Sequence, residues 1–478
     1  MTTIATPPPG SPGDTLAPTI SAPPTTAASA PTHLPGRWID GWNPEDPTQW
    51  TSGGKQIADR NLRWSIFAEF LGFCVWQLWS IVVVTLPAAG FDLTTSQLFW
   101  LISMPALVGA TLRIPYTFAV SRFGGRNWTI VSAALLLMPT IGLALIVQRP
   151  DTSFPVLLAV AALAGVGGGN FASSMANITF FYPQREKGWA LGLNAAGGNL
   201  GAAVAQLAVP IVITLGAGAA LTLPMAGWVW VPLIVIAIVG AATRMDNLTT
   251  AKADVGAIMA ALREPHMWVM SLLYIATFGS FIGFAGVFPK LIADQFPHFS
   301  AFHVGSATLS LAFLGALVGS LARPYGGRLA DRFGGTVVTM CALSVMAAGA
   351  LAVSQTIESA IFPVFLGLFL MLFAAAGIGN GATYRMIPTI FALRAGEREA
   401  HHRPGSVGAQ RAASAALGLV SAVGAFGGFL IPQALGRSKS LYGTYEVGLL
   451  WFVAAYVCAL AIAGGVYLRM GARHGIRI

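Results

Sequence analysis

The stretch GATLRIPYTFAVSRFGGRNWT, residues 109–129, carries one arginine inside an otherwise apolar segment, followed by a short, basic, glycine-rich turn. Arg113 is the unusual residue. A guanidinium keeps its proton and costs at least about 2.5–3.5 kcal/mol at the centre of a bilayer. No acidic residue lies within this stretch. Something else inside the folded protein must therefore compensate the charge.

The same pattern returns 210 residues later as GSLARPYGGRLADRFGGTVVT, residues 319–339. Arg323 then corresponds to Arg113. Phe333-Gly334-Gly335 corresponds to Phe123-Gly124-Gly125 at the same offset. This repetition predicts that the chain consists of two copies of one half.

Composition indicates a chain built for lipid. Of its 478 residues, 55% are hydrophobic and only 9% are charged, whereas a soluble domain carries roughly a quarter charged residues. The mean hydropathy is +0.69. The three cysteines, Cys74, Cys341 and Cys458, fall in apolar segments without the spacing of metal ligands, so we expect small core residues. The sequence predicts an all-α, polytopic membrane protein.

Twelve apolar runs are long enough to cross a hydrocarbon core of roughly 30 Å as helices. They are residues 62–86, 98–120, 127–147, 155–181, 189–214, 226–243, 266–289, 303–322, 335–354, 361–384, 411–433 and 446–468. An even number of spans places both termini on the same side of the membrane.

Basic residues indicate which side that is. The loops on the side of the termini hold Arg122, Arg126, Arg185, Lys187, Arg244, Lys252, Arg263, Arg328, Arg332, Arg394, Arg398 and Arg403, and the opposite loops hold only Arg149, Lys290, Arg437 and Lys439. The positive-inside rule then predicts cytoplasmic termini in a cell membrane protein. This bias accounts for the net charge of +9, so no nucleic-acid partner is required.

The predicted organisation has six parts. Residues 1–36 form a disordered, Pro/Thr/Ala-rich cytoplasmic tail, and residues 37–61 lie against the membrane surface. Two six-helix halves, 62–245 and 266–470, are joined by a cytoplasmic linker, 246–265, and residues 471–478 form a second tail. Two pseudosymmetric halves of six spans, with the longest central loop between them, are typical of a major facilitator transporter. The turn GGRLADRFGG, residues 326–335, resembles the loop motif of that superfamily, while the first copy lacks the aspartate.

In such a bundle, spans two and eight face each other across the central cavity, so Arg113 and Arg323 converge there. Two guanidiniums repel unless an anion lies between them, and their planar forks suit bidentate bonds to a flat oxyanion. The alternative is that each arginine bonds helix-end carbonyls or extends to an interface. Matched mid-span positions favour the anion site, whereas Arg385, near the end of span ten, is expected to play the structural role.

Spans four, five and eleven are rich in glycine, which allows close contact between helices. Packing alone does not explain the amides that accompany these glycines. Asn170, Asn177, Asn194 and Asn199 stand in the same helices and need partners or a ligand.

Several of these segments closely resemble the NarK-type nitrate/nitrite porters. They are GGGNFASSMANITFFYP from residue 167, ALGLN from 190, GNLG from 198, SLLYIATFGSFIGF from 271 and GAFGGFLIP from 424. The resemblance extends over nearly the whole chain from Gly41 onward. It implies that the anion is nitrate or nitrite, and that two glycine-rich signatures act as flexible packing elements around it. The signature glycines are Gly188, Gly192, Gly197, Gly198, Gly418, Gly424, Gly427 and Gly428.

The resemblance also implies roles for individual residues. Arg113 and Arg323 would clamp the anion, Asn199 and Tyr274 would hydrogen-bond it, Ser421 would line the cavity opposite, and Phe73, Phe171 and Phe278 would wall it. Ring faces suit a weakly hydrated planar ion whose edge binds donors. The sequence departs from the family at Ala195 and Ala196, where the signature often has glycines, and at Glu69, where well-known exchangers are apolar.

Glu69 is the one acid that we place within a span, and an intramembrane carboxylate is by default a functional candidate. It could carry a proton. Alternatively, it lies about two turns from Leu62 and pairs with Arg60 or Arg63 near the cytoplasmic end. The predicted function is nitrate uptake by alternating access, coupled to protons. The alternative is nitrate/nitrite antiport without proton coupling.

Other classes of protein fit less well. The seven histidines form no catalytic constellation, and no nucleotide loop or metal site is present, so we expect neither an enzyme nor a cofactor. An organic-solute carrier of the same fold would not explain paired arginines with almost no intramembrane acids. A non-transporting anion sensor would be excluded by measurable flux. The predicted partners are nitrate, nitrite, possible coupling protons and the lipid bilayer, around a monomer.

Overall fold

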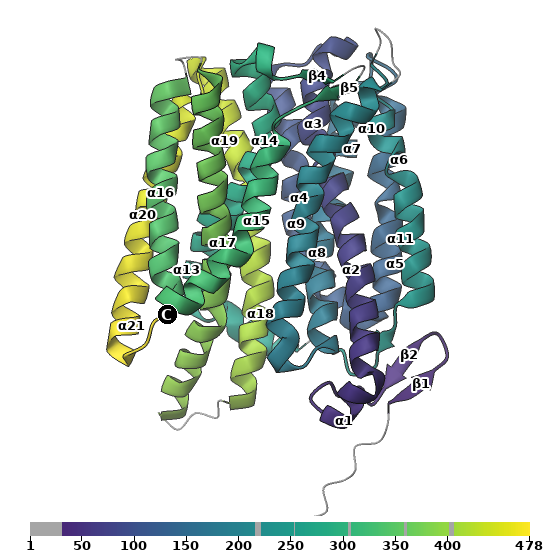
Figure 1. Cartoon of the computed structure of the whole chain (residues 1–478), viewed down its shortest axis with the longest axis vertical. Helices are drawn as coiled ribbons and strands as arrows, with labels where there is room; N and C mark the ends of the chain where they lie inside the picture. The colour runs from purple at the N-terminus through teal and green to yellow at the C-terminus, as the bar shows by residue number, and fades with distance from the viewer. Residues whose placement is uncertain (1–30, 216–220, 253, 305–306, 358–360, 401–405) are drawn as a thin grey trace, which may run out of the picture.

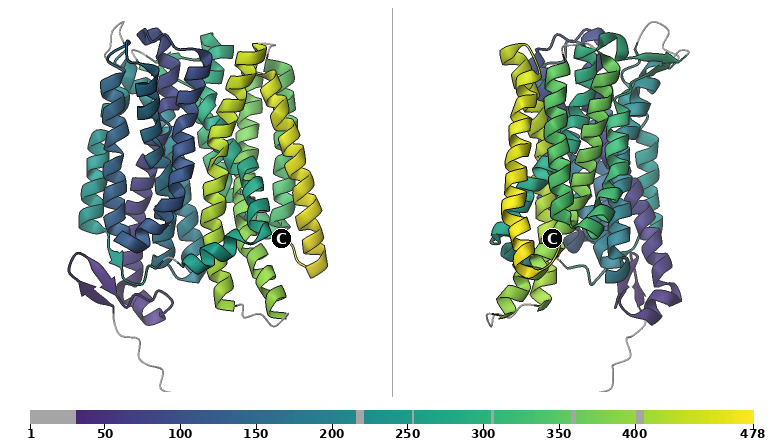
Figure 2. Two further views of the ribbon diagram at one scale, coloured as in Figure 1. Left: turned by 180° about the vertical axis from the view of Figure 1, so that it is seen from behind. Right: turned by 60° about the vertical axis from the view of Figure 1, so that its left-hand side comes forward.

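The structure is a computed structural model that describes residues 31–215, 221–252, 254–304, 307–357, 361–400 and 406–478. Helices dominate it and run roughly parallel to one long direction (Figure 1). The purple-to-teal half and the green-to-yellow half form two groups that stand side by side when the molecule is seen from behind (Figure 2). The predicted all-α, two-half architecture is confirmed.

In the described residues of the first half, ten α-helical segments make six spans. They are α2 (Lys55–Trp76) with α3 (Leu78–Thr85), α4 (Thr95–Phe123), α5 (Gly125–Leu135) with α6 (Leu137–Ile146), α7 (Phe154–Leu163) with α8 (Gly165–Phe181), α9 (Gln184–Thr214), and α10 (Met225–Trp228) with α11 (Val231–Arg244). Each paired set continues one span across a local break in the helix.

The second half repeats this plan. Its spans are α13 (Pro265–Tyr274) with the π-helix η3 (Ile275–Gly279) and α14 (Ser280–Gln295), α15 (Phe313–Phe333), α16 (Gly335–Thr356), α17 (Phe362–Ala400), α18 (Ser406–Ala425) with α19 (Gly427–Tyr442), and α20 (Glu446–Ala463) with η6 (Gly464–Leu468) and α21 (Arg469–His474). By length and apolar composition alone, eleven helical segments in the described part of the chain could cross a membrane. The twelfth span is α15, which carries Arg323, Arg328, Asp331 and Arg332 and is therefore less apolar.

The internal repeat is visible in the backbone. α4 and α15 end at the equivalent residues Phe123 and Phe333. The glycine that follows each has a positive φ, 87° at Gly124 and 94° at Gly334, a conformation that side-chain-bearing residues rarely adopt. The two copies of the turn therefore share a backbone shape as well as a sequence.

Several helix ends differ from the predicted spans; α17, for example, continues to Ala400 rather than ending at residue 384. Span eight does not begin at residue 303, because β4 (Phe302–Val304) and β5 (Ala307–Leu309) form a hairpin there and the helix begins at Phe313. The residues of β4 and β5 pair as strands before Phe313, while the basic segment after Arg323 continues the helix to Phe333. Span one begins earlier than predicted, since α2 starts at Lys55 rather than at residue 62.

The segment before the first span is folded. β1 (Thr32–Leu34) lies within the predicted disordered tail and pairs with β2 (Trp38–Asp40), which in turn pairs with β3 (Asn247–Leu248) of the linker. The prediction is therefore wrong for the end of the tail, and its residues 1–30 lie outside the described residues. α1 (Pro47–Gln49) and η1 (Trp50–Gly54) then lead into α2. Composition could not predict this strand pairing, because β3, the partner of β2, lies far along the chain in the linker.

Asp246 fastens this sheet to the first half. Its carboxylate accepts hydrogen bonds from Arg37 at 2.8 Å, Arg60 at 2.7 Å and Asn61 at 3.0 Å. The side chain of Asp246 is only 3% exposed. Arg37, α2 and the start of the linker are thus tied together at the end of the bundle that carries β1–β3.

The two halves meet on the other side of the bundle centre. Gln433 of α19 donates to Ser103 of α4 at 2.7 Å, and Gln206 of α9 donates to the carbonyl of Ala285 in α14 at 2.6 Å. Ser103 lies between Arg113 and the end of α4 nearer to β4 and β5. The halves are therefore in contact on the β4–β5 side of Arg113.

The cysteine prediction holds for one residue of three. Cys74 is buried and its thiol lies 3.3 Å from the carbonyl oxygen of Gly201. Cys341 and Cys458 are exposed, so the prediction that they are core residues is wrong. An apolar run in a membrane helix does not distinguish its inward face from its lipid-facing one.

Candidate functional site

Arg113 is buried in the interior of α4 and is held by both halves of the protein. Its Nε donates to the carbonyl of Gly168 in α8 at 3.1 Å. Its Nη1 donates to Ser421 of α18 twice, to the carbonyl at 2.9 Å and to Oγ at 2.8 Å. Its Nη2 is buried and has no partner among the described residues. Three donations fix the guanidinium and leave one nitrogen free for a ligand.

Aromatic rings surround this guanidinium. Its central carbon lies 4.5 Å from the ring centre of Phe171, 5.2 Å from that of Phe278 and 5.7 Å from that of Trp76. Phe171 and Phe278 come from different halves and stack on each other with centroids 6.4 Å apart. Phe73 packs edge-on against Phe171 at 6.2 Å. Phe171 and Phe278 therefore contact Arg113, and Phe73 forms the layer behind Phe171.

Arg323 is buried at the matching place in α15, with 8% of the residue exposed. Its guanidinium carbon lies 5.6 Å from the ring centre of Tyr384 in α17. Tyr384 packs against Tyr274 at 6.0 Å, and Tyr274 stacks on Phe278 at 5.2 Å. A continuous row of rings thus connects the surroundings of the two arginines.

Several of the buried hydrogen-bonding atoms without a partner belong to residues of this region. Within the described chain, Arg113 Nη2, Arg323 Nη1, the hydroxyl of Tyr274 and both amide atoms of Asn199 are buried without a partner. The two arginines and Tyr274 are close enough to interact electrostatically. Each unpaired buried group costs about 1–3 kcal/mol. A small anion with several acceptor oxygens could satisfy the donors and separate the two positive charges.

Asn199 reaches the level of these rings from α9. That helix packs against both α2 and α15. On one side of Asn199 in the sequence, Gly198 lies against Glu69, and on the other, Gly201 lies against the Cβ of Phe73. These contacts put the part of α9 that carries Asn199 at the level of Phe73 and Glu69 in α2.

Glu69 does not pair with either arginine that precedes it, so that alternative is wrong. It is fully buried, and its Oε2 accepts hydrogen bonds from Ser174 and, at 2.7 Å, from Asn194. Arg60 instead donates to Asp246 at 2.7 Å. Because α2 begins at Lys55, Glu69 lies about 20 Å along the helix from its start, deeper than the sequence suggested.

The surroundings of Glu69 connect it to the arginines. Its Oε1 is buried without a partner in the described residues, and it interacts electrostatically with both Arg113 and Arg323. Ser174 lies in α8 and Asn194 in α9, so three helices contribute to this polar cluster. Of the four amides singled out from the sequence, Asn194 belongs to this polar cluster. Asn199 is one of the buried residues whose amide atoms have no partner.

The signature glycines divide into two groups. At five of them, an added Cβ would press against a neighbouring residue. Gly197 would meet Ile66, Gly198 would meet Glu69, Gly424 would meet Tyr274, Gly427 would meet Gly279, and Gly428 would meet Ile282 and Ala106. At Gly188 and Gly192 no atom lies within 4 Å, and at Gly418 the nearest is Thr117 at 4.0 Å. The described structure therefore shows close packing at the first five glycines and open space beside the last three.

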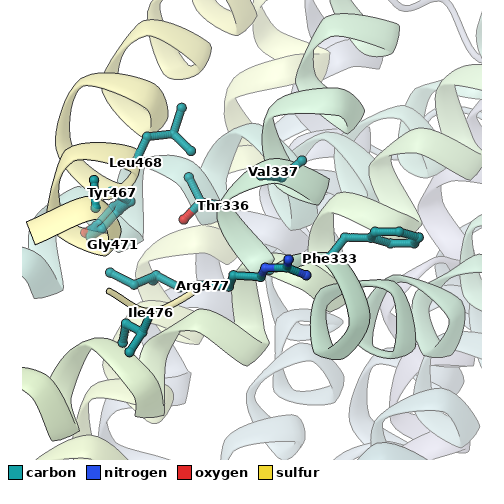
Figure 3. A pocket seen from close by; sticks show the side chains of 11 residues that line it. Phe333, Thr336, Val337, Tyr467, Leu468, Gly471, Ile476 and Arg477 are labelled. Atoms are coloured by element: carbon teal, nitrogen blue, oxygen red, sulfur yellow. The ribbon is translucent and has the colours of Figure 1, made fainter. Parts of the chain in front are cut away.

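Two basic residues away from the centre have structural partners. Arg385 donates to Asp331 at 2.6 Å, joining α17 to the end of α15, and both side chains are more than half exposed. A separate pocket has a volume of about 190 Å³, and Arg477 is the one charged residue among the side chains that line it. Figure 3 shows these side chains. Arg477 donates to the carbonyl of Arg332 at 3.3 Å. Neither place combines the buried cations and rings found at the centre.

Sequence reasoning missed Trp76, Ser174 and Tyr384. Trp76 and Tyr384 place rings against the two arginines, and Ser174 donates to Glu69. A single aromatic or serine in an apolar span gives no signal of its own, because such residues are common in helix packing. Only the fold brings them to the charged groups.

Comparison with known proteins places the chain in a family. The sequence profile of the Major Facilitator Superfamily matches residues 68–432. The nitrate/nitrite transporter NarU of Escherichia coli (strain K12) is 40% identical over 452 residues, which cover 90% of this chain and 96% of NarU. The chain belongs to the major facilitator superfamily and to its NarK-type nitrate/nitrite porters. As a member of the major facilitator superfamily it is a transporter and not an enzyme.

Further relatives and solved structures agree with this placement. The probable nitrate/nitrite antiporter NarK2 of Thermus thermophilus is 34% identical over 457 residues, covering 91% of this chain and 98% of that protein. The crystal structure of a D-xylose–proton symporter matches the fold with a TM-score of 0.61 at 15% sequence identity, covering 85% of this chain and 97% of that one. At such low identity, the last comparison concerns the major facilitator fold alone.

Proposed function

We propose that this protein transports nitrate and nitrite across the cell membrane by alternating access, with the anion bound between Arg113 and Arg323. The observation that carries the proposal is the pair of buried arginines, 210 residues apart, each with one unpartnered terminal nitrogen. Two relatives that match this chain over nearly their whole length are named nitrate/nitrite transporters, and these names support the choice of anion.

The chemistry of the site suits a flat oxyanion. The two guanidiniums offer planar donors to oxygens at the edge of the ion, and Tyr274 and Asn199 offer further hydrogen bonds. Phe171 and Phe278 present apolar ring surfaces to its faces. A bound anion also offsets the repulsion between the two arginines, which an empty site leaves uncompensated except for Glu69.

Alternating access requires the halves to move around the fixed site. In the present arrangement they are in contact on the β4–β5 side of Arg113, through Gln433 and Ser103. An anion that bridges Arg113 and Arg323 draws the halves together, because each half contributes one of the arginines. Closely packed glycines, such as Gly279 against Gly427, allow the helices around the site to shift without side-chain clashes.

Nitrate uptake coupled to protons is the coupling mode that we favour. The supporting observation is that Glu69 is buried in the same electrostatic environment as both arginines. When ionised, Glu69 offsets part of their positive charge, and when protonated it leaves that charge for the anion. Proton and anion binding are then mutually favourable, which is the thermodynamic requirement for symport.

Nitrate/nitrite antiport without proton coupling is the alternative. Two fixed positive charges favour an occupied cavity during reorientation, so exchange needs no titrating group. The name of the 34% identical relative, a probable nitrate/nitrite antiporter, favours this mode. In either mode the proposed transporter acts as a monomer. Both termini and the β1–β3 end lie in the cytoplasm, because the basic residues concentrate in the loops on that side.

Counterflow in proteoliposomes tests the function. Vesicles loaded with nitrite should accumulate labelled nitrate from outside, and empty vesicles should do so only when an inward proton gradient is imposed. Accumulation that needs internal nitrite and ignores the pH gradient would replace symport by exchange. Absence of nitrate flux in every condition, with correctly folded protein, would overturn the proposed function.

A further inference from the structure

Asn380 is a buried amide that the site described so far does not use. It lies in α17 with 1% of the residue exposed. Both its Oδ1 and its Nδ2 are buried without a hydrogen-bond partner among the described residues. A side-chain amide without any partner in a membrane interior is costly, and such groups in native structures call for a ligand, a water or a function.

The neighbours of Asn380 place it between the two elements that form the second half of the site. A Cβ at Gly381 would press on the carbonyl of Arg323 in α15, and a Cβ at Gly379 would lie 2.8 Å from Thr277 in η3. η3 also contains Phe278. Asn380 stands between these two contacts in the sequence, so its part of α17 packs against both α15 and η3.

Helical geometry also brings Asn380 onto the side of α17 that faces Arg323. Tyr384 follows it by four residues, and positions four apart lie on the same face of an α-helix, one turn from each other. The ring of Tyr384 lies 5.6 Å from the guanidinium of Arg323. Asn380 therefore occupies the next turn of the face that carries a ring to the second arginine.

The internal repeat supplies a control. Asn170 in α8 precedes Asn380 by 210 residues, the same offset that relates Arg113 to Arg323. The Oδ1 of Asn170 accepts hydrogen bonds from Ser132 at 3.0 Å and from Ser173 at 3.1 Å. The amide in the first half is thus engaged by the protein. Its counterpart in the second half keeps all of its hydrogen-bonding capacity.

We propose that Asn380 is a further anion-binding residue, whose Nδ2 donates to an oxygen of the anion held at Arg323. This inference rests on the proposed function, because it names an additional group of the same site. The anion then gives a partner to two buried unpaired donors, Nδ2 of Asn380 and Nη1 of Arg323.

The test compares Asn380→Ala with Asn170→Ala, using initial rates of labelled nitrate uptake in proteoliposomes and thermal unfolding of the purified protein. Asn380→Ala should raise the half-saturating nitrate concentration about tenfold, as expected for losing a hydrogen bond to a charged group, with a smaller change in the maximal rate. Asn170→Ala should lower the unfolding temperature and leave half-saturation within about twofold.

An isosteric variant separates a binding role from a packing role. Asn380→Asp keeps the shape of the side chain but replaces the donor by a negatively charged acceptor, so nitrate binding should fall further than in Asn380→Ala. Half-saturation within about twofold of wild type in both variants would overturn the inference. Arg323→Lys distinguishes the two failures: if it loses transport while both Asn380 variants bind normally, the proposed site stands and only the role of Asn380 fails.

Discussion

Arg113 and Ser421 lie 308 residues apart in the sequence and in opposite halves, yet Nη1 of the arginine donates to both the hydroxyl and the carbonyl of the serine. The arginine of the first half is therefore held in part by the second half. These bonds use the side of the guanidinium that faces α18 and leave Nη2 unpaired. Arg113 thus forms a contact between the halves and keeps one donor nitrogen free for the proposed anion.

The donors contributed by Asn199 and Tyr274 should be measurable individually. Both groups are buried with unpaired polar atoms, so Asn199→Ala or Tyr274→Phe removes a donor without breaking a hydrogen bond within the described protein. Each variant should weaken nitrate binding by about 1–3 kcal/mol, the range for a hydrogen bond to a charged group. Titration of nitrate against transport rate gives the half-saturation of each.

Tyr456→Phe provides the control for the tyrosine, because its hydroxyl is buried but hydrogen-bonded to Ser280 at 2.8 Å. That variant should change stability and leave half-saturation near the wild-type value. Normal half-saturation in both Asn199→Ala and Tyr274→Phe would remove these residues from the site.

The role of Glu69 can be separated from its packing by Glu69→Gln. Glutamine keeps the size of the side chain, and its carbonyl can still accept from Ser174 and Asn194. Under symport, the variant should lose uptake driven by a pH gradient while retaining part of the nitrate/nitrite counterflow, because exchange requires only that the loaded carrier reorient. Uptake that responds to the pH gradient as strongly in Glu69→Gln as in wild type would assign Glu69 a structural role.

The signature glycines of span five should differ in their tolerance of a methyl group. At Gly198 a Cβ would collide with the carboxyl group of Glu69, whereas at Gly192 it meets no atom within 4 Å. Gly198→Ala should therefore displace the Glu69 cluster and reduce both stability and transport, by about 1–3 kcal/mol in the free energy of unfolding. Gly192→Ala should fold and transport nearly as wild type. Equal behaviour of the two variants would contradict the packing described around Glu69.

The repeat and the two central arginines could be predicted from the sequence because both leave strong local signals. A charged residue in an apolar span is rare, and a second one at the matched position of a repeated motif is rarer still. The structure confirms that Arg113 and Arg323 are buried at equivalent places in α4 and α15. Roles carried over by resemblance, such as those of Asn199 and Tyr274, remain predictions that the unpaired atoms support.

Contacts between distant segments could not be predicted in this way. The partners of Glu69 come from α8 and α9, more than 100 residues later, so the sequence suggested nearby arginines instead. The hairpin at the start of span eight and the strand pairing of the amino-terminal segment depend on partners that no hydropathy pattern identifies. For the same reason, the sequence did not separate Gly192, which is open, from Gly198, which is packed.

Nitrate uptake by Arg323→Lys in proteoliposomes tests most directly whether the anion binds between the two arginines. Lysine keeps the positive charge but removes the planar fork, so the variant should insert and fold while transport falls sharply, and Arg113→Lys should do the same independently. Wild-type half-saturation and rate in Arg323→Lys would contradict the account.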